Sequence, residues 1–210
     1  MELVWYVFEY AGTIAFAISG ALIGISRNMD IFGMTVLAMV TAIGGGIIRD
    51  LLVGEIPPHS LQSSTYVLLI IAVTVILFLI YRTHYRKRMA GTWARRTYLL
   101  ADALGLASFT VTGTSVGVKV CPDMATLAII LGVVTAVGGG IIRDVLAQRI
   151  PSVLREDVYA LPAIIGGAVY YLVAQGGLVN WAAVLSFATV FIIRIMAMYF
   201  HWSLPKVRKS

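Results

Sequence analysis

The sequence predicts an all-α membrane protein that crosses a bilayer several times. Of its 210 residues, 60% are hydrophobic and 12% are charged, whereas a soluble domain has about 25% charged residues. The mean hydropathy is +0.91. Seven apolar runs are each long enough to cross the hydrocarbon core of a membrane. Composition and run length together therefore predict seven transmembrane helices rather than a soluble domain.

The runs are spaced so that the chain divides into two halves of similar length. They are expected near 3–25, 31–54, 61–81, 98–118, 124–147, 157–174 and 181–200. We expect a first unit over 1–81, a basic cytoplasmic linker over 82–97, a second unit over 98–174, and a seventh span with a basic tail over 175–210.

The Lys and Arg residues indicate the orientation of the chain. With seven spans, twelve of them fall in the links and the C-terminal tail on one side, and only Lys119 falls on the other. Basic residues are concentrated on the cytoplasmic side of membrane proteins. We therefore expect the N-terminus outside and the C-terminus in the cytoplasm. The net charge of +6 is an orientation signal and does not indicate a nucleic-acid partner.

A ten-residue motif occurs twice, within the second and the fifth spans. Residues 41–50 read TAIGGGIIRD and residues 135–144 read TAVGGGIIRD. Glycine weakens a helix, and an ionisable residue within a span is a candidate functional residue. The candidate kink glycines are Gly44, Gly45, Gly46, Gly138, Gly139 and Gly140, and the candidate pore or gate charges are Arg49, Asp50, Arg143 and Asp144.

The two halves match beyond this motif. Glu9 aligns with Asp102, and Ser19 aligns with Thr112. A duplicated unit with an odd number of spans must be inverted in the membrane, and such folds place their substrate sites near the midplane at broken helices. We therefore expect two inverted three-helix repeats and an added seventh helix. The second and fifth spans should be kinked at their glycines and surround a water-filled route.

The arginines need partners, because a guanidinium group stays protonated. Helix geometry should bring Arg49 and Arg143 toward the bilayer centre from opposite sides. Adjacent residues do not face each other on a helix, so Asp50 alone is not expected to neutralise Arg49. The candidate partners are Glu9, Asp102, carbonyl groups freed at the glycines, and the aspartate of the opposite repeat.

Each feature also has a purely structural interpretation. The glycines could allow close helix packing, and the Arg–Asp pairs could clamp the fold internally. Four small polar residues beside the glycines could line a path or could bond the carbonyl group four residues earlier. They are Ser19, Thr41, Thr112 and Thr135.

Other classes of site find little support. The chain has no nucleophile and base pair, phosphate-binding loop or metal-ligand spacing. We therefore expect neither an enzyme nor a cofactor or metal site. The single cysteine, Cys121, excludes an internal disulfide. Arg194, near one end of the seventh span, is expected to extend to the membrane surface.

The doubled Gly-Gly-Gly-x-x-Arg-Asp motif, with two three-span units, resembles the bacterial branch of the trimeric intracellular cation (TRIC) channel family. The same domain is also labelled a glycine transporter, or UPF0126. The resemblance implies a homotrimer in which each subunit has its own pore, lined by the kinked second and fifth spans and conducting K⁺ and Na⁺. It implies that the triple glycines are the kinks and that the Arg and Asp residues are pore or gate charges.

We therefore expect a monovalent cation channel in a bacterial inner membrane, with membrane lipid as its other partner. A secondary transporter for glycine or another small zwitterion is the alternative, and a non-conducting scaffold is the third. Arginine in a pore repels cations, so Arg49 and Arg143 must be neutralised by carboxylates or act as movable plugs. We favour the movable plug.

Overall fold

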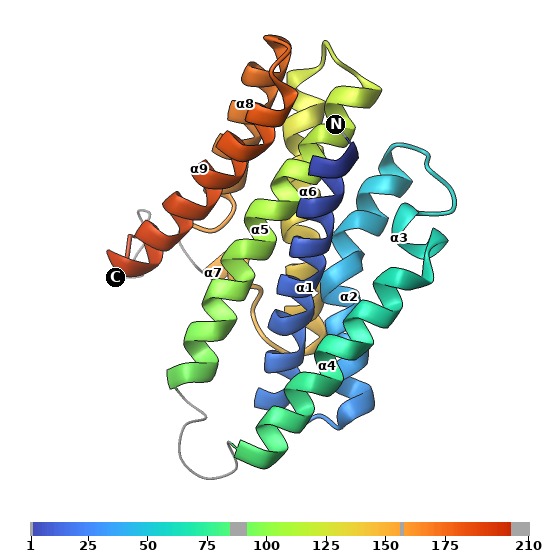
Figure 1. The fold of residues 1–210 in the computed structure, drawn as a ribbon. Helices are drawn as coiled ribbons and strands as arrows, with labels where there is room; N and C mark the ends of the chain where they lie inside the picture. The colour runs from blue at the N-terminus through green and yellow to red at the C-terminus, as the bar shows by residue number, and fades with distance from the viewer. Residues whose placement is uncertain (1, 85–91, 156–157, 203–210) are drawn as a thin grey trace.

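The chain is all-helical throughout the part that the structure describes (Figure 1). The computed structural model describes residues 2–84, 92–155 and 158–202. The helices of these ranges are α1 (Glu2–Ser26), α2 (Ile31–Leu52), α3 (His59–Gln62), α4 (Ser64–His84), α5 (Thr92–Val120), α6 (Ala125–Leu146), α7 (Ser152–Arg155), α8 (Leu161–Gln175) and α9 (Val179–Tyr199).

Six of these helices are long and apolar enough to cross a membrane, namely α1, α2, α4, α5, α6 and α9. By length and composition these six helices match the predicted polytopic membrane protein. The predicted span over 157–174 corresponds to α8, an apolar helix of 15 residues, which is shorter than a typical membrane crossing. The seventh crossing therefore stays a prediction.

The predicted linker over 82–97 is helical at both ends. α4 continues to His84 and α5 begins at Thr92, and residues 85–91 lie outside the described residues. The hydropathy pattern missed these extra helical residues because basic residues at the end of a span end the apolar run without ending the helix.

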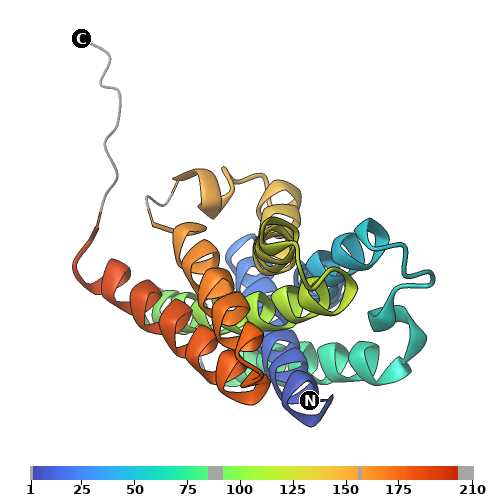
Figure 2. The same ribbon diagram turned by 90° about the horizontal axis from the view of Figure 1, so that it is seen from above.

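The four helices α1, α2, α5 and α6 form the centre of the molecule (Figures 1 and 2). α4 lies on one flank, and α8 and α9 pair on the other. α1 and α5 run in opposite directions, as do α2 and α6, which the colour gradient of Figure 1 makes visible. α5 and α1 are the most buried of the spanning helices. α4 is the least buried, and its apolar side chains, such as Leu68 and Ile76, are exposed on the outside of the molecule.

α2 and α6 cross at the triple glycines with their backbones in contact. A Cβ atom at Gly45 would overlap the carbonyl oxygen of Thr135, and one at Gly139 would overlap that of Thr41. Only glycine permits this approach, which is typical of helix packing in membranes. The helices are continuous from Ile31 to Leu52 and from Ala125 to Leu146. The glycines therefore serve close packing, and the kinks stay a prediction.

The same reciprocal packing continues on α1 and α5. Gly20 lies against the backbone of α2 at Ala38, and Gly113 lies against the backbone of α6 at Leu131. Thr41 and Thr135 line these crossings, and each donates its hydroxyl hydrogen to the carbonyl group four residues earlier, in Leu37 and in Leu131. The hydrogen bonds that the structural interpretation expects are thus present at both threonines, and their place along a pore stays a prediction.

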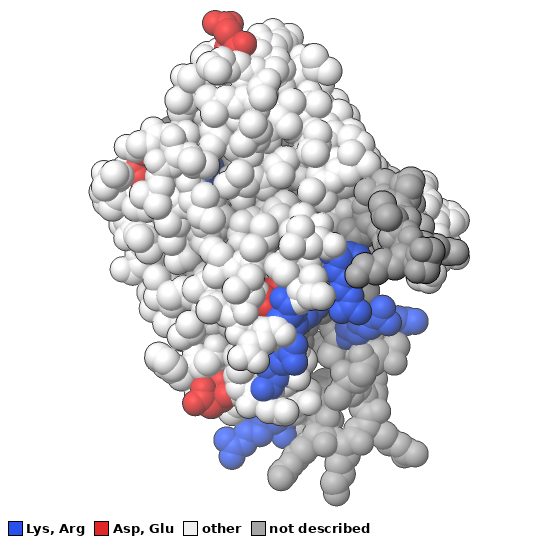
Figure 3. Space-filling model, turned by 180° about the vertical axis from the view of Figure 1, so that it is seen from behind, with Lys and Arg blue, Asp and Glu red and all other residues white. Residues whose placement is uncertain are grey.

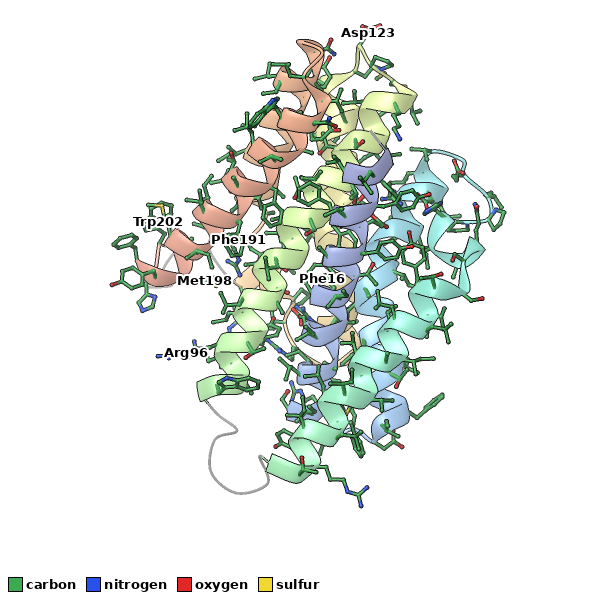
Figure 4. The ribbon with its side chains drawn as sticks, in the orientation of Figure 1. Phe16, Arg96, Asp123, Phe191, Met198 and Trp202 are labelled. Atoms are coloured by element: carbon green, nitrogen blue, oxygen red, sulfur yellow. The ribbon has the colours of Figure 1, made fainter. Side chains whose placement is uncertain are left out.

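Charged side chains are distributed unevenly along the long axis of the molecule. Figure 3 shows the basic side chains of the rear face gathered in its lower half, where the link between α1 and α2 lies. Asp123 lies at the opposite end, and Arg96 lies toward the lower end (Figure 4). The wide apolar band between them is consistent with a membrane-embedded surface.

The three glycines of one motif should differ in their tolerance of alanine. Gly45→Ala should lower the free energy of unfolding by about 1–3 kcal/mol, because its Cβ atom would overlap the Thr135 carbonyl oxygen. Gly46→Ala is the matched control, since the nearest atom to its Cβ is Arg49 Nη2 at 3.7 Å, and alanine favours a helix by about 1 kcal/mol. Thermal unfolding in detergent measures both. A Gly45→Ala protein as stable as Gly46→Ala would contradict the close packing.

Candidate functional site

Arg143 lies in a completely buried and fully hydrogen-bonded cluster. Its Nε donates to Asp144 Oδ1 at 2.9 Å, and its Nη1 donates to Asp102 Oδ1 at 2.7 Å. Nη1 also donates to the Ser19 hydroxyl oxygen, and Nη2 donates to the Tyr98 hydroxyl oxygen at 3.1 Å. The side chains come from α1, α5 and α6, so this cluster joins three helices. Every nitrogen of the guanidinium group has an acceptor.

Arg49 occupies the equivalent place in the first half but is held more loosely. Its Nε donates to Asp50 Oδ1 at 2.8 Å. Its Nη1 lies 3.8 Å from Glu9 Oε2, which is an ion pair without a hydrogen bond. Neither atom has a hydrogen-bond partner among the described residues, although both side chains are almost fully buried. The Trp5 ring lies 5.9 Å from the guanidinium carbon.

Each aspartate of the motif also holds the start of a single-turn helix. Asp50 Oδ2 accepts a hydrogen bond from the backbone N–H of His59, where α3 begins, at 2.9 Å. Asp144 Oδ2 accepts one from Ser152, where α7 begins, at 2.8 Å. The first N–H groups of a helix have no partner within it. Each Arg–Asp pair therefore anchors the segment that follows its span, and the role of these four residues as pore or gate charges stays a prediction.

The sequence correctly predicted the outer partners of both arginines. Glu9 approaches Arg49, and Asp102 approaches Arg143. Asp50 is not the only partner of Arg49, as expected, although each arginine does pair with the adjacent aspartate, because Nε, close to the backbone, can reach sideways to its carboxylate. The described hydrogen bonds include none from Arg49 to a glycine carbonyl group or to the aspartate of the other half. Ser19 belongs to the Arg143 cluster, and Thr112 is buried on α5 near Glu9.

A cavity of about 340 Å³ lies against the Arg49 cluster. It is formed at the N-terminal end of α1 and the C-terminal ends of α2 and α5, together with the segment around α3. Its lining residues are Trp5, Tyr6, Arg49, Asp50, Val53, Glu55, His59, Val116, Lys119 and Val120. Arg143 is not among them, so of the two guanidinium groups only that of Arg49 faces this space.

Sequence reasoning missed the roles of three further residues. Aromatic residues at the ends of spans are expected at the membrane surface, but Trp5 and Tyr98 lie over Arg49 and Arg143. A signal was present, since each stands four residues before the acid of its cluster. Arg194 does not extend to the surface as predicted: it is 2% exposed, its Nη1 donates to the Val158 carbonyl oxygen at 3.1 Å, and it packs on the Tyr159 ring.

Comparison with known proteins places the chain in a family. A family model described as glycine transporter matches residues 6–82 and residues 99–175. A UPF0126 membrane protein of Vibrio cholerae is 41% identical over 202 residues, which is 95% of this chain and 81% of the relative. The chain belongs to the UPF0126 membrane-protein family. Another member, the UPF0126 inner membrane protein YadS of Escherichia coli, is 35% identical over 95% of this chain and 94% of its own.

Solved structures confirm the resemblance to TRIC channels. One from a study of conductance through TRIC cation channels is 36% identical, with a TM-score of 0.85 and 97% of both chains covered. The TRIC orthologue of Rhodobacter sphaeroides is 32% identical, with a TM-score of 0.86 and 95% and 99% covered. A prokaryotic TRIC channel in 0.5 M KCl is 30% identical, with a TM-score of 0.89 and 97% and 100% covered.

The two clusters should differ in their contribution to stability. Arg143→Gln should lower the free energy of unfolding by about 3–5 kcal/mol, because two buried carboxylates lose their counter-charge. Arg49→Gln, the matched variant of the first half, should lower it less, because Arg49 makes one hydrogen bond and faces a cavity. Chemical or thermal unfolding in detergent measures both. If Arg49→Gln lowered the free energy of unfolding as much as Arg143→Gln, or more, the additional hydrogen bonds of Arg143 would not contribute to stability.

Proposed function

We propose that this protein is a channel for monovalent cations, K⁺ and Na⁺, with a pore inside each subunit lined by α2 and α6. The proposal is supported by the TRIC cation channels that the chain resembles over nearly its whole length. The Rhodobacter sphaeroides relative is described as a trimeric channel, so we extend the homotrimer to this chain. Membrane lipid is its other expected partner.

The balance of buried charge is the observation that carries the proposal. Asp50 and Glu9 accompany Arg49, and Asp102 and Asp144 accompany Arg143. Each cluster therefore has two carboxylates for one guanidinium group, which gives a formal charge of −1 when all three groups are ionised. Rings and clusters of carboxylates favour cations in channels, and uncompensated arginines favour anions. A cation pathway is thus compatible with two arginines in the protein interior.

The proposed membrane arrangement has seven crossings. α1, α2 and α4 would form one repeat, and α5, α6 and α8 its inverted copy, with α9 added. The opposite directions of the paired helices, the reciprocal glycine contacts and the two family matches support it. The basic end would face the cytoplasm of a bacterial inner membrane, with the N-terminus outside. A bend at the glycines would then widen the route between α2 and α6.

Electrical recording and transport assays on the purified protein separate the two functions. A channel should give unitary currents in planar bilayers with KCl on both sides. The alternative, a carrier of glycine or another small zwitterion, is favoured by the description of the family model. It should give saturable counterflow of labelled glycine in liposomes and no unitary currents. That second outcome would overturn the channel proposal.

Each arginine should act as a plug that leaves the constriction when the channel opens. Arg49→Ala should raise the open probability, because the guanidinium group no longer obstructs the space between Glu9 and the cavity. Arg143→Ala should raise the open probability of the folded protein as well, although the loss of four buried hydrogen bonds should also lower its stability. Single-channel recording measures both. Open probabilities equal to that of the wild type would reject the plug.

A further inference from the structure

Arg194 on α9 is a third buried arginine, and it belongs to neither of the two clusters. Its side chain is almost completely buried. An arginine at membrane depth is unfavourable and is a candidate functional residue by default. α9 lies beyond both segments that the family model matches, so Arg194 is not part of the duplicated motif. Its contacts must therefore be examined separately.

Arg194 holds the segment that leads from α7 to α8. Its Nη1 donates a hydrogen bond to the Val158 carbonyl oxygen at 3.1 Å. Its guanidinium carbon lies 4.5 Å from the centre of the Tyr159 ring. Both of these residues are buried. A hydrogen bond from a charged donor is stronger than a neutral one, and a guanidinium group stacks favourably on an aromatic ring. One side chain of α9 thus fixes two consecutive residues of this segment.

Tyr159 extends this contact to the second motif. A Cβ atom at Gly140 would lie 3.3 Å from Tyr159 Oη and 3.6 Å from Arg143 Nη2. The tyrosine hydroxyl group and the end of the Arg143 guanidinium group therefore lie over the same glycine. Tyr159 contacts Arg194 with its ring and reaches the motif with its hydroxyl group, so a displacement of Tyr159 changes the space next to Arg143.

The first half lacks this arrangement. Tyr66 stands at the equivalent place, 93 residues before Tyr159, and its ring stacks on Tyr10 with 5.4 Å between the ring centres. Among the described residues, only Arg49 Nη2 lies within 4 Å of the position of a Cβ atom at Gly46, so the Tyr66 hydroxyl group does not reach this glycine. The half without an arginine from α9 is also the half whose motif arginine faces the cavity.

We propose that Arg194 is a positioning residue that holds Tyr159 against the second motif and thereby keeps the Arg143 side of the protein closed. The role rests on the proposed channel function. Arg143 leaves its cluster only when α9 releases Val158 and Tyr159, whereas Arg49 needs no such release. The appended helix therefore controls one of the two ends of the route.

Thiol labelling of the full-length protein tests the positioning without any transport measurement. A Val158→Cys variant in a Cys121→Ser background carries one thiol, at a buried side chain. The substitution keeps the carbonyl group that Arg194 binds. A water-soluble maleimide should react slowly with this thiol. Adding Arg194→Gln should speed the reaction about tenfold, because the loss of a charged hydrogen bond favours local opening.

Val190→Ala is the matched control for the labelling. Val190 is completely buried one helical turn before Arg194, and it packs against Gly166 of α8. The substitution loosens α9 without changing a charge or a polar contact, so it should leave the labelling rate close to that of the parent protein. A rate as high as that of Arg194→Gln would show that general loosening of α9 explains the result, and would overturn the positioning role.

Arg194→Lys is a milder variant that covers the case in which Arg194→Gln does not fold. Lysine keeps the positive charge and a donor for the Val158 carbonyl oxygen but loses the planar group that stacks on Tyr159. The labelling rate should lie between those of the parent protein and Arg194→Gln. A folded Arg194→Lys protein that is labelled no faster than its parent would contradict the role of the stacking contact.

Single-channel recording tests the effect on opening. Arg194→Gln should raise the open probability severalfold, and Tyr159→Leu should do the same. The double variant should open little more than either single variant, because both substitutions remove the same contact. Independent effects that multiply in the double variant would contradict an action of Arg194 through Tyr159.

The two experiments separate this inference from the channel proposal. Rapid labelling of the Arg194→Gln protein, in a preparation that carries no current, would retain the positioning contact and remove the channel. Cation-selective currents whose open probability Arg194→Gln leaves unchanged would retain the channel and remove the control by α9.

Discussion

The pairing of two buried guanidinium groups with carboxylates is the interaction on which the rest of the structure depends. An arginine within a membrane span is unfavourable unless it has partners in the protein interior. Here Asp50 and Asp144 hold the Nε atoms of their neighbours, and each also anchors the first N–H group of a short helix. The same contacts thus neutralise the arginine and fix the segment that leads to the next span.

The Gly-Gly-Gly-x-x-Arg-Asp motif can be understood as a single packing unit. Its middle glycine allows α2 and α6 to cross with their backbones in contact. Its third glycine lies beneath the guanidinium group at ordinary contact distance, since a Cβ atom at Gly46 would lie 3.7 Å from Arg49 Nη2, and one at Gly140 would lie 3.6 Å from Arg143 Nη2. Helical side chains lean toward the N-terminus, so an arginine three residues after a glycine covers it. The motif therefore places the helix crossing and the buried charge one helical turn apart.

Much of this could be predicted from the sequence, because it follows from local patterns. The helical class, the positions of the spans and the acids opposite each arginine come from run length and from the alignment of the two halves. The looseness of the first cluster could not be predicted, because the two motifs are nearly identical. It arises from their surroundings: the Tyr98 hydroxyl oxygen accepts a hydrogen bond from Arg143, whereas the indole of Trp5 has no acceptor to offer Arg49.

The excess of carboxylate over guanidinium groups at both clusters predicts the sign of the permeant ion. The most direct measurement is the reversal potential of the wild-type protein in a planar bilayer that separates two concentrations of KCl. Two ionised carboxylates for each guanidinium group predict a reversal potential close to the equilibrium potential of K⁺. A reversal potential close to that of Cl⁻ would show that the arginines are not neutralised and would contradict the cation pathway.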